Sequence, residues 1–384
     1  MDSIALLDRL LRFDTVSRNP NRALVEDVAG LLRDAGLAPV VLPEPSGGKA
    51  SLFVTVGSSD HPGVLLSGHT DVVPVDGQAW SVPPFALTRR DGRLHGRGAA
   101  DMKGFVACAL RAVLRASERE LRTPIHLALS HDEELGCLGL GSLLDLLARA
   151  PARPLICLVG EPTGMRVATG HKGKVALRAT CAGREAHSAL APTGLNAIHL
   201  AADLLGRLRL LQARLERDGP RDPDYDVPFT TVHAGRIEGG VALNMVPSRC
   251  VLDFEIRNVV EDDLATLVAE VRAEAEAITD AARVRAPEAG IAITELFSYP
   301  GLGTPPDAWA VRFVQSLAGT TGTIKVAFGT EGGLFAERLR LPTVVCGPGF
   351  MAQGHKPDEF VAEEQMARCD AMLDALLDRL AAGL

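Results

Sequence analysis

The chain of 384 residues lacks any uninterrupted apolar run near the roughly 18 residues needed to cross a bilayer. It also lacks a surplus of positive charge, because its formal net charge is -8, so it offers no basic surface to nucleic acid. The amino terminus lacks the basic start and continuous apolar core of a signal peptide, and its apolar spacing predicts an amphipathic helix over residues 1–11. These absences predict a cytoplasmic protein without a membrane or nucleic-acid partner.

The cysteines do not form a recognisable framework. There are seven of them, an odd number, they lie far apart, and no Cys-x-x-Cys motif occurs. We therefore expect buried free thiols rather than disulfides or a cysteine metal site. A hydrophobic content of 47% with 23% charged residues is typical of a globular protein, and the length allows two domains.

What the chain does contain is a set of histidines and carboxylates that follow or lie near short apolar runs. Runs of this kind predict buried strands, and the carboxyl ends of parallel strands are where ligands bind in α/β proteins. The sequence therefore predicts that these side chains meet at one edge of a parallel sheet. The five candidates are His69, Asp101, Glu134, Glu161 and His355.

Taken singly, each candidate has an ordinary structural interpretation. His69 could lie in a surface loop after a strand. Asp101 precedes an apolar helical stretch and could cap it. Residues 131–134, His-Asp-Glu-Glu, could be a solvated charge run. Glu161 precedes a proline, and His355 leads into two acidic residues, Asp358 and Glu359, that could begin a helix.

Five such positions in one chain favour a common explanation, which is a site for two metal ions. A mixture of imidazole and carboxylate ligands suits zinc, cobalt or manganese better than calcium or magnesium, which prefer oxygen alone. Asp71, two residues after His69, is well placed to accept the second N–H of that imidazole. Adjacent glutamates point in different directions, so one can bind metal while the other holds a water.

Four segments carry a family resemblance. They are Gly-His-Thr-Asp-Val-Val-Pro at 68–74, Gly-Arg-Gly-Ala-Ala-Asp-Met-Lys-Gly at 96–104, Asp-Glu-Glu-Leu-Gly at 132–136 and Gly-Glu-Pro-Thr at 160–163. In this order they resemble the motif series of the dizinc aminoacylase and carboxypeptidase family, which includes acetylornithine deacetylase, succinyl-diaminopimelate desuccinylase and bacterial glutamate carboxypeptidase.

The resemblance implies a role for each motif residue. Asp101 would bridge two zinc or cobalt ions, with His69 and Glu161 on one ion and Glu134 and His355 on the other. Glu133 would be the general base and acid, and Asp71 would orient His69.

The resemblance also implies the architecture. A zinc-peptidase-like α/β catalytic domain, with a mixed sheet flanked by helices, would comprise residues 1–173 and 299–384. Residues 174–298 would form an inserted ferredoxin-like α+β domain that serves as a lid and dimerisation surface. The sequence there predicts the order βαββαβ, with strands at 174–181, 230–237, 250–256 and 291–297 and helices at 195–215 and 262–282.

Three residues of the insert match family positions that act on substrate. His187 would reach the active site of the partner in a homodimer, and Asn244 and Arg257 would line the substrate pocket, with the guanidinium of Arg257 on an α-carboxylate. Their ordinary interpretations are a surface histidine, a turn asparagine and an arginine at a strand end.

Substrate choice depends on the segments 328–335 and 352–359, which are similar to those of acetylornithine deacetylases. The similarity implies removal of the acetyl group from N2-acetyl-L-ornithine, in arginine biosynthesis, with Glu331 near the cationic side chain. Glu331 could instead be a carboxylate at a helix N-terminus. Phe350 departs from the subfamily pattern and could narrow the acyl pocket or pack in the core.

Two alternatives remain open. The first is a deacylase of another N-acyl amino acid, or a dipeptidase, within the same family. The second is a binding protein that keeps the fold without catalysis, which predicts a damaged ligand set, whereas every ligand and Glu133 are present.

Overall fold

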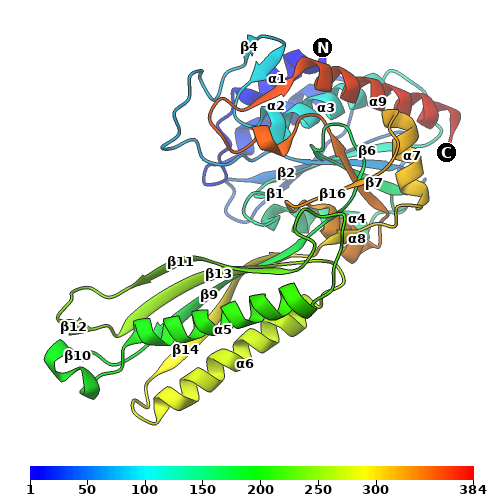
Figure 1. Cartoon of the computed structure of the whole chain (residues 1–384). Coiled ribbons are helices and arrows are strands. Elements are labelled where there is room, and N and C mark those ends of the chain that lie inside the picture. Colours follow the sequence, from blue (N-terminus) through cyan, green and yellow to red (C-terminus); the bar gives the residue numbers. More distant parts are fainter. The chain divides into compact units, whose positions relative to one another are not determined.

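The computed structural model describes all residues, 1–384, and they form two compact units (Figure 1). The first unit combines Met1–His171 with Leu302–Leu384, and the second is Lys172–Gly301. The domain boundaries expected from the sequence, at 173/174 and 298/299, lie two and three residues from these. No helix in either unit has the length and apolar character needed to cross a membrane.

The first unit is built on a mixed sheet of nine strands. Its strand order is β1-β2-β6-β3-β7-β17-β8-β15, and β16 pairs with β8. The mixed character predicted from the sequence is confirmed, because antiparallel strands flank a parallel centre. The strands are β1 (Val40–Pro43), β2 (Ala50–Val56), β3 (Val64–His69), β6 (Ile125–Ser130), β7 (Ile156–Pro162), β8 (Ala168–His171), β15 (Leu302–Gly303), β16 (Ile324–Val326) and β17 (Thr343–Gly347).

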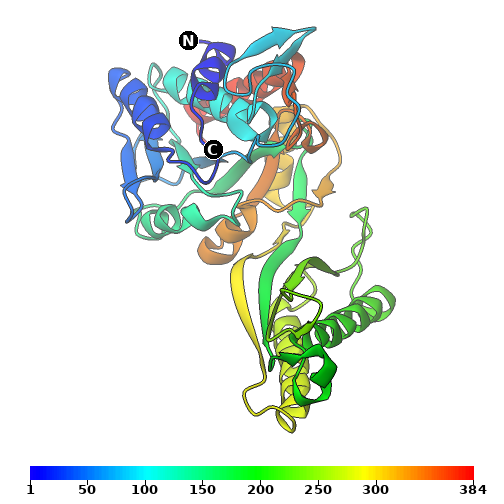
Figure 2. The ribbon, with the colours of Figure 1, turned by 90° about the vertical axis from the view of Figure 1, so that its left-hand side faces the viewer.

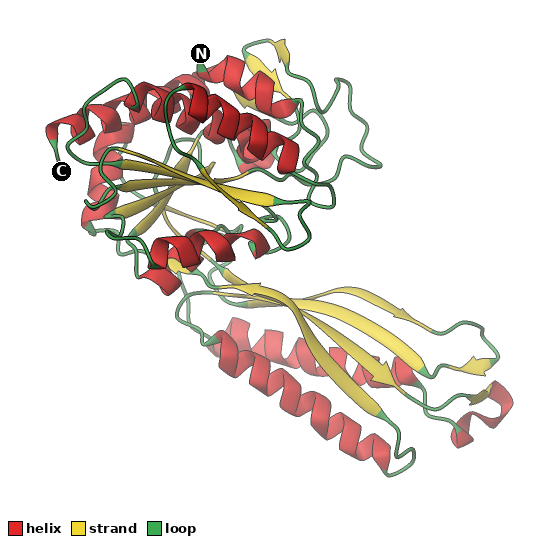
Figure 3. Cartoon of the chain, turned by 180° about the vertical axis from the view of Figure 1, so that it is seen from behind, coloured by secondary structure: helices red, strands yellow, loops and turns green.

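Helices cover both faces of this sheet, as Figure 3 shows. On one face the buried side chains of alternate strand residues join those of α1, α2, α3, α7 and α9, and on the other face they join those of α4 and α8. The first and last helices of the chain, α1 and α9, are neighbours on the same face, and both termini belong to this unit (Figure 2). The helices are α1 (Ser3–Leu11), α2 (Arg22–Asp34), α3 (Gly104–Ala116), α4 (Gly141–Ala148), α7 (Trp309–Ala318), α8 (Gly332–Leu339) and α9 (Glu363–Ala382).

The four central strands, β6, β3, β7 and β17, are parallel. They are buried along their whole length, and the continuous apolar runs that predicted them are typical of parallel strands covered on both faces. Because parallel strands end at the same edge, the chain leaves all four at one place. The predicted ligands lie either in the last residues of these strands, as His69 and Glu161 do, or in the segments beyond them.

A small three-stranded sheet, in the order β18-β5-β4, lies beside this edge. In this sheet β4 (Thr88–Arg90) and β5 (Arg93–His95) form an antiparallel hairpin, and both turn residues, Asp91 and Gly92, have positive φ. The expectation that Asp358 and Glu359 begin a helix is wrong. They precede β18 (Phe360–Ala362), which pairs with β5, and α9 begins only at Glu363.

The second unit has a four-stranded antiparallel sheet, in the order β11-β13-β9-β14, with α5 and α6 packed on one face (Figure 1). Alternate residues of β9 and β13 face the helices, and leucines four or three apart on α5 complete that core. The order βαββαβ is the one expected of this segment. The elements are β9 (Gly173–Ala182), α5 (Ala197–Asp218), β11 (Thr231–Gly239), β13 (Arg249–Asn258), α6 (Leu264–Arg283) and β14 (Gly290–Tyr299).

We predict that Gly160, near the end of β7, cannot take a side chain without loss of stability. A Cβ there would lie 1.9 Å from Cγ of the buried Phe105 on α3, so Gly160→Ala must displace that ring or the strand end. Overpacking of this kind costs about 1–3 kcal/mol of unfolding free energy.

Chemical denaturation would measure that loss, with Gly30→Ala in α2 as the control. A Cβ at Gly30 meets nothing within 4 Å, and alanine favours a helix by about 1 kcal/mol over glycine. Equal stability of the two variants would contradict the assignment of Gly160 as a packing constraint.

Candidate metal centre and active site

His69 is the last residue of β3, and its imidazole is fully buried among acidic groups. Nδ1 lies 2.9 Å from the main-chain carbonyl oxygen of Asp71. That contact directs the Nδ1 proton to the carbonyl and leaves Nε2 free to bind a metal ion. Nε2 lies 3.2 Å from Oδ1 of Asp101 and 3.7 Å from Oε1 of Glu161.

Asp101 lies between two histidines. While Oδ1 faces His69, Oδ2 lies 3.1 Å from Nε2 of His355. The alternative that Asp101 caps the following helix is wrong, because its φ of -126° and ψ of 93° are not helical and α3 begins only at Gly104. The two oxygens of one carboxylate therefore point into two different groups of ligands.

Glu161 and Glu134 complete the two groups. Glu161, near the end of β7, is on the His69 side, and Oε1 of Glu134 lies 3.2 Å from Nε2 of His355 on the other side. Donor atoms of His69, Asp101 and Glu134 all lie within 4.8 Å of one another, and the same holds for His69, Glu133 and Glu161. The structure brings all five predicted ligands and Glu133 into one cluster.

The electrostatics of the cluster are those of crowded buried acids. Burial, together with the negative charge of Asp101, raises the pKa of Glu134 to about 7. Burial and neighbouring carboxylates likewise raise the pKa values of Glu133 and Glu161 well above their usual range. Contacts with Asp101 and Glu134 raise the pKa of His355 to about 10.

These groups fit divalent cations. Several carboxylates share one desolvated space, and their negative charge is unfavourable there unless positive charge compensates it. Two positive ions would neutralise that charge and use the imidazole nitrogens and carboxylate oxygens that already converge. This donor set is the one that zinc and related transition metals prefer.

Asp71 holds the segment that carries the glutamates. Its carboxylate accepts hydrogen bonds from the main-chain N–H groups of Glu133, at 3.1 Å, and Glu134, at 3.3 Å, and from the hydroxyl of Ser17, at 2.7 Å. Next to them Asp132 is buried and pairs with Lys49 at 2.5 Å. Residues 131–134 are therefore not a solvated charge run.

Glu331 lies just before α8 and is completely buried. Its carboxylate accepts hydrogen bonds from the hydroxyls of Ser67 on β3, at 3.0 Å, and Ser130 on β6. Glu331 is the N-cap residue of α8, as its ordinary interpretation expected, but its side chain makes no capping hydrogen bond to that helix. Burial raises its pKa, although the two hydroxyls oppose this.

Comparison with known proteins agrees with this geometry. The model of Peptidase family M20/M25/M40 matches residues 65–379. The chain belongs to this family. An acetylornithine deacetylase of Myxococcus xanthus is 34% identical over 382 residues, which is 96% of this chain and 95% of the relative.

Solved structures show the same fold. An M20 family metallo-carboxypeptidase from Sulfolobus solfataricus has a TM-score of 0.79 at 18% identity and matches over 100% of both chains. A dinuclear metal-binding M20 peptidase from Bacillus subtilis has a TM-score of 0.68 at 13% identity, over 100% of this chain and 98% of the other. The chain is thus an M20 metal-dependent hydrolase with a cluster of groups able to hold metal.

The three predicted substrate residues of this M20 hydrolase lie in the second unit. His187 belongs to β10 (Ala186–His187), which pairs with β12 (Met245–Val246), and the N–H of Ser188 donates to the carbonyl of Asn244 at 2.9 Å. His187 and Asn244 are therefore exposed neighbours. Arg257, at the end of β13, lies elsewhere in the unit and pairs with Glu255 at 2.7 Å.

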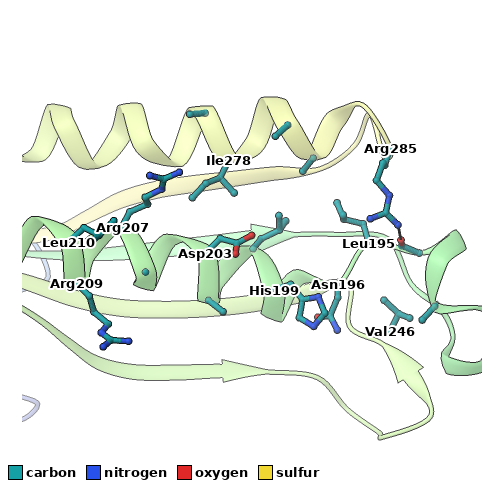
Figure 4. Close-up of a pocket in the computed structure, with 18 of the residues that line it drawn as sticks. Leu195, Asn196, His199, Asp203, Arg207, Arg209, Leu210, Val246, Ile278 and Arg285 are labelled. Carbon is teal, nitrogen blue, oxygen red and sulfur yellow. Dashed lines mark hydrogen bonds between the residues drawn. The ribbon is translucent and has the colours of Figure 1, made fainter.

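The second unit also contains a groove of about 1200 Å³. It runs between α5 and α6, and Figure 4 shows Leu195, Arg207, Leu210 and Ile278 among the side chains around it. No predicted catalytic, metal or substrate residue lines this groove.

Sequence reasoning missed several residues that support the site. Ser67, Ser130, Ser17 and Lys49 are ordinary residue types at unremarkable positions. Only the fold shows that the three serines bind Glu331 and Asp71, and that Lys49 binds Asp132 beside the site. A stronger signal was present in Arg97, an arginine between two glycines just before the segment of Asp101. An arginine in a predicted buried stretch requires an acidic partner.

Proposed function

We propose that this M20 hydrolase removes the acetyl group of N2-acetyl-L-ornithine, releasing L-ornithine and acetate, as arginine biosynthesis requires. The observation that carries the proposal is the position of Asp101, whose two oxygens face two separate histidines at 3.2 and 3.1 Å. The relative from Myxococcus xanthus, named acetylornithine deacetylase, supports the choice of substrate.

The two groups of ligands suggest how two zinc or cobalt ions are held. His69 and Glu161 would bind one ion with Oδ1 of Asp101, and His355 and Glu134 would bind the other with Oδ2. When bound, such ions supply an acidified water and polarise the substrate carbonyl. Zinc and cobalt suit the same donor set.

Glu133 is the proposed general base and acid. Its side chain lies with those of His69 and Glu161, and the pKa of its carboxyl is raised by burial, so it has the affinity to accept a proton from the attacking water. It would then return that proton to the nitrogen of the departing ornithine. The carboxylate of Asp71 positions this base, because it accepts a hydrogen bond from the main-chain N–H of Glu133. The main-chain carbonyl oxygen of Asp71 also orients the imidazole of His69.

The substrate contacts are proposed with residues of the second unit acting as a lid. Arg257 would bind the α-carboxylate through two parallel hydrogen bonds, and it is already oriented by Glu255. His187 would reach the active site of the partner in a homodimer and stabilise the oxyanion there, and Asn244, its exposed neighbour, would line the substrate pocket. Glu331 remains a predicted partner of the substrate ammonium, although both its oxygens already accept hydroxyls.

The same unit is the proposed surface of a homodimer. Apolar side chains next to His187 and Asn244 are strongly exposed in the single chain, and Leu243 is completely so. A second copy covering them would remove an apolar patch from water. The residues are Leu190, Val241, Leu243 and Met245.

Phe350 bears on the alternative substrates. It is 46% exposed and its ring lies against Gly164, so it does not pack in the core. An exposed aromatic ring three residues beyond β17 could favour a larger acyl group than acetyl, and this observation keeps a deacylase of another N-acyl amino acid as the second candidate.

Replacement of Glu133 tests the proposed base. Glu133→Gln keeps the size of the side chain but cannot accept the proton, so kcat should fall about 10²–10⁴-fold. The variant should still bind as many metal ions as the wild type, because Glu133 is not a proposed ligand. Glu337→Gln, on the exposed face of α8, makes the same chemical change and should be fully active. Wild-type turnover by Glu133→Gln would rule out this base.

A substrate panel tests the reaction itself. The zinc-loaded or cobalt-loaded enzyme would be given N2-acetylornithine, N-acetylmethionine, N-succinyl-diaminopimelate and a dipeptide, each with and without a chelator. We expect the highest kcat/KM for N2-acetylornithine and its loss on chelation, measured by amine release. Chelator-sensitive preference for another member would retain the metal mechanism and refute the substrate assignment.

A further inference from the structure

Glu359 is a buried acid that the proposed mechanism does not use. Its side chain is 1% exposed, and its two oxygens serve different partners. Oε1 accepts the main-chain N–H groups of Ala100, at 2.9 Å, and Asp101, at 3.1 Å. Oε2 accepts Nη1 of Arg97 at 2.6 Å. Glu359 thereby fixes the backbone of the residue that lies between the two histidines.

Arg97 extends this contact to a second ligand. Its guanidinium, also 1% exposed, lies over the ring of Trp80, and Nη2 donates to Oε1 of Gln78 at 2.5 Å. Nε2 of Gln78 in turn donates to the main-chain carbonyl of His355 at 3.2 Å. A continuous chain of hydrogen bonds therefore joins the backbone of Asp101 to the backbone of His355.

A purely stabilising role does not account well for this arrangement. A buried ion pair adds little net stability compared with apolar residues of the same volume, because both charges lose their water. The ion pair does orient the backbone, because charge-assisted hydrogen bonds to main-chain groups fix the orientation of those groups. Asp71 gives a parallel within the same site, because it also accepts two successive main-chain N–H groups, those of Glu133 and Glu134.

We propose that Glu359, Arg97 and Gln78 are positioning residues that set the separation of Asp101 and His355 for metal binding. Glu359 acts on Asp101, which both ions would share, whereas His355 is the only proposed ligand that Gln78 contacts. The inference rests on the proposed two-ion site and assigns these residues no contact with metal or substrate. Loss of supporting hydrogen bonds of this kind weakens metal binding about 10–100-fold.

The test is zinc titration of the metal-depleted protein against a competing chelator, which resolves the two binding steps. Glu359→Gln, whose amide cannot pair with Arg97 as the carboxylate does, should weaken both steps. Gln78→Met removes the bond to the carbonyl of His355 and also the oxygen that accepts hydrogen bonds from Arg97 Nη2 and Trp80 Nε1. It leaves the bonds of Glu359 to Arg97 Nη1 and to the main-chain N–H of Asp101 in place, so it should weaken the step that involves His355 and leave the other nearly unchanged. A residue that merely stabilised the fold would not divide the two steps in this way.

Asp358→Asn is the matched control. Asp358 precedes Glu359 in the same loop and also joins two segments, because its carboxylate accepts the N–H and hydroxyl of Ser81 at 2.7 Å each. It touches no ligand backbone through that carboxylate, so this variant should bind both ions as the wild type does. An equal loss in Asp358→Asn and Glu359→Gln would overturn the inference.

The remaining outcomes are also decisive. Wild-type affinities in both Glu359→Gln and Gln78→Met would overturn the positioning role. If Glu359→Gln gives no cooperative thermal transition, the half-buried Gln78→Met variant decides by the same criterion. The wild-type protein tests the proposed function separately: failure to bind two ions would refute the dinuclear site, whereas two ions with unaltered variants would refute only this inference.

Discussion

The crowding of acids in one desolvated space is the constraint on which the rest of the structure depends. Asp101, Glu133, Glu134 and Glu161 converge with two histidines where four parallel strands end. Burial and mutual repulsion raise the pKa values of the three glutamates, so the cluster as it stands is costly to charge. Divalent cations on either side of Asp101 would neutralise these carboxylates, so the same cluster would then bind metal favourably.

Strands and buried hydrogen bonds hold the residues of the cluster in place. The strands deliver His69 and Glu161 directly, while loops deliver the other ligands and need additional restraint. Asp71 restrains the glutamate segment, and Glu359 restrains the segment of Asp101. His355 has a φ of 59°, in a region that non-glycine residues seldom occupy. Strained backbone of this kind persists where the surroundings determine it, which is typical of functional sites.

Much of this could be predicted from the sequence, for a physical reason. Each ligand follows or adjoins an apolar run, and the run at 125–130 is the strand β6 that the structure shows. What could not be predicted depends on distant partners. Glu331 meets Ser67 across 264 positions, and Glu359 meets Arg97 across 262. Local patterns suggested a helix start for Glu359 because nothing nearby indicates its true partners. The path of Asp101 likewise differs from a cap because contacts to His69 and His355 determine it.

The most direct test of the account is metal removal. Native mass spectrometry of the wild-type protein would count bound ions, and calorimetry would compare thermal unfolding before chelation, after chelation and after return of zinc. The account predicts two ions per chain, a lower unfolding temperature for the metal-free protein, and recovery with zinc, because ions that bind only the folded state stabilise it. A protein that binds no zinc and unfolds at the same temperature in all three states would contradict it.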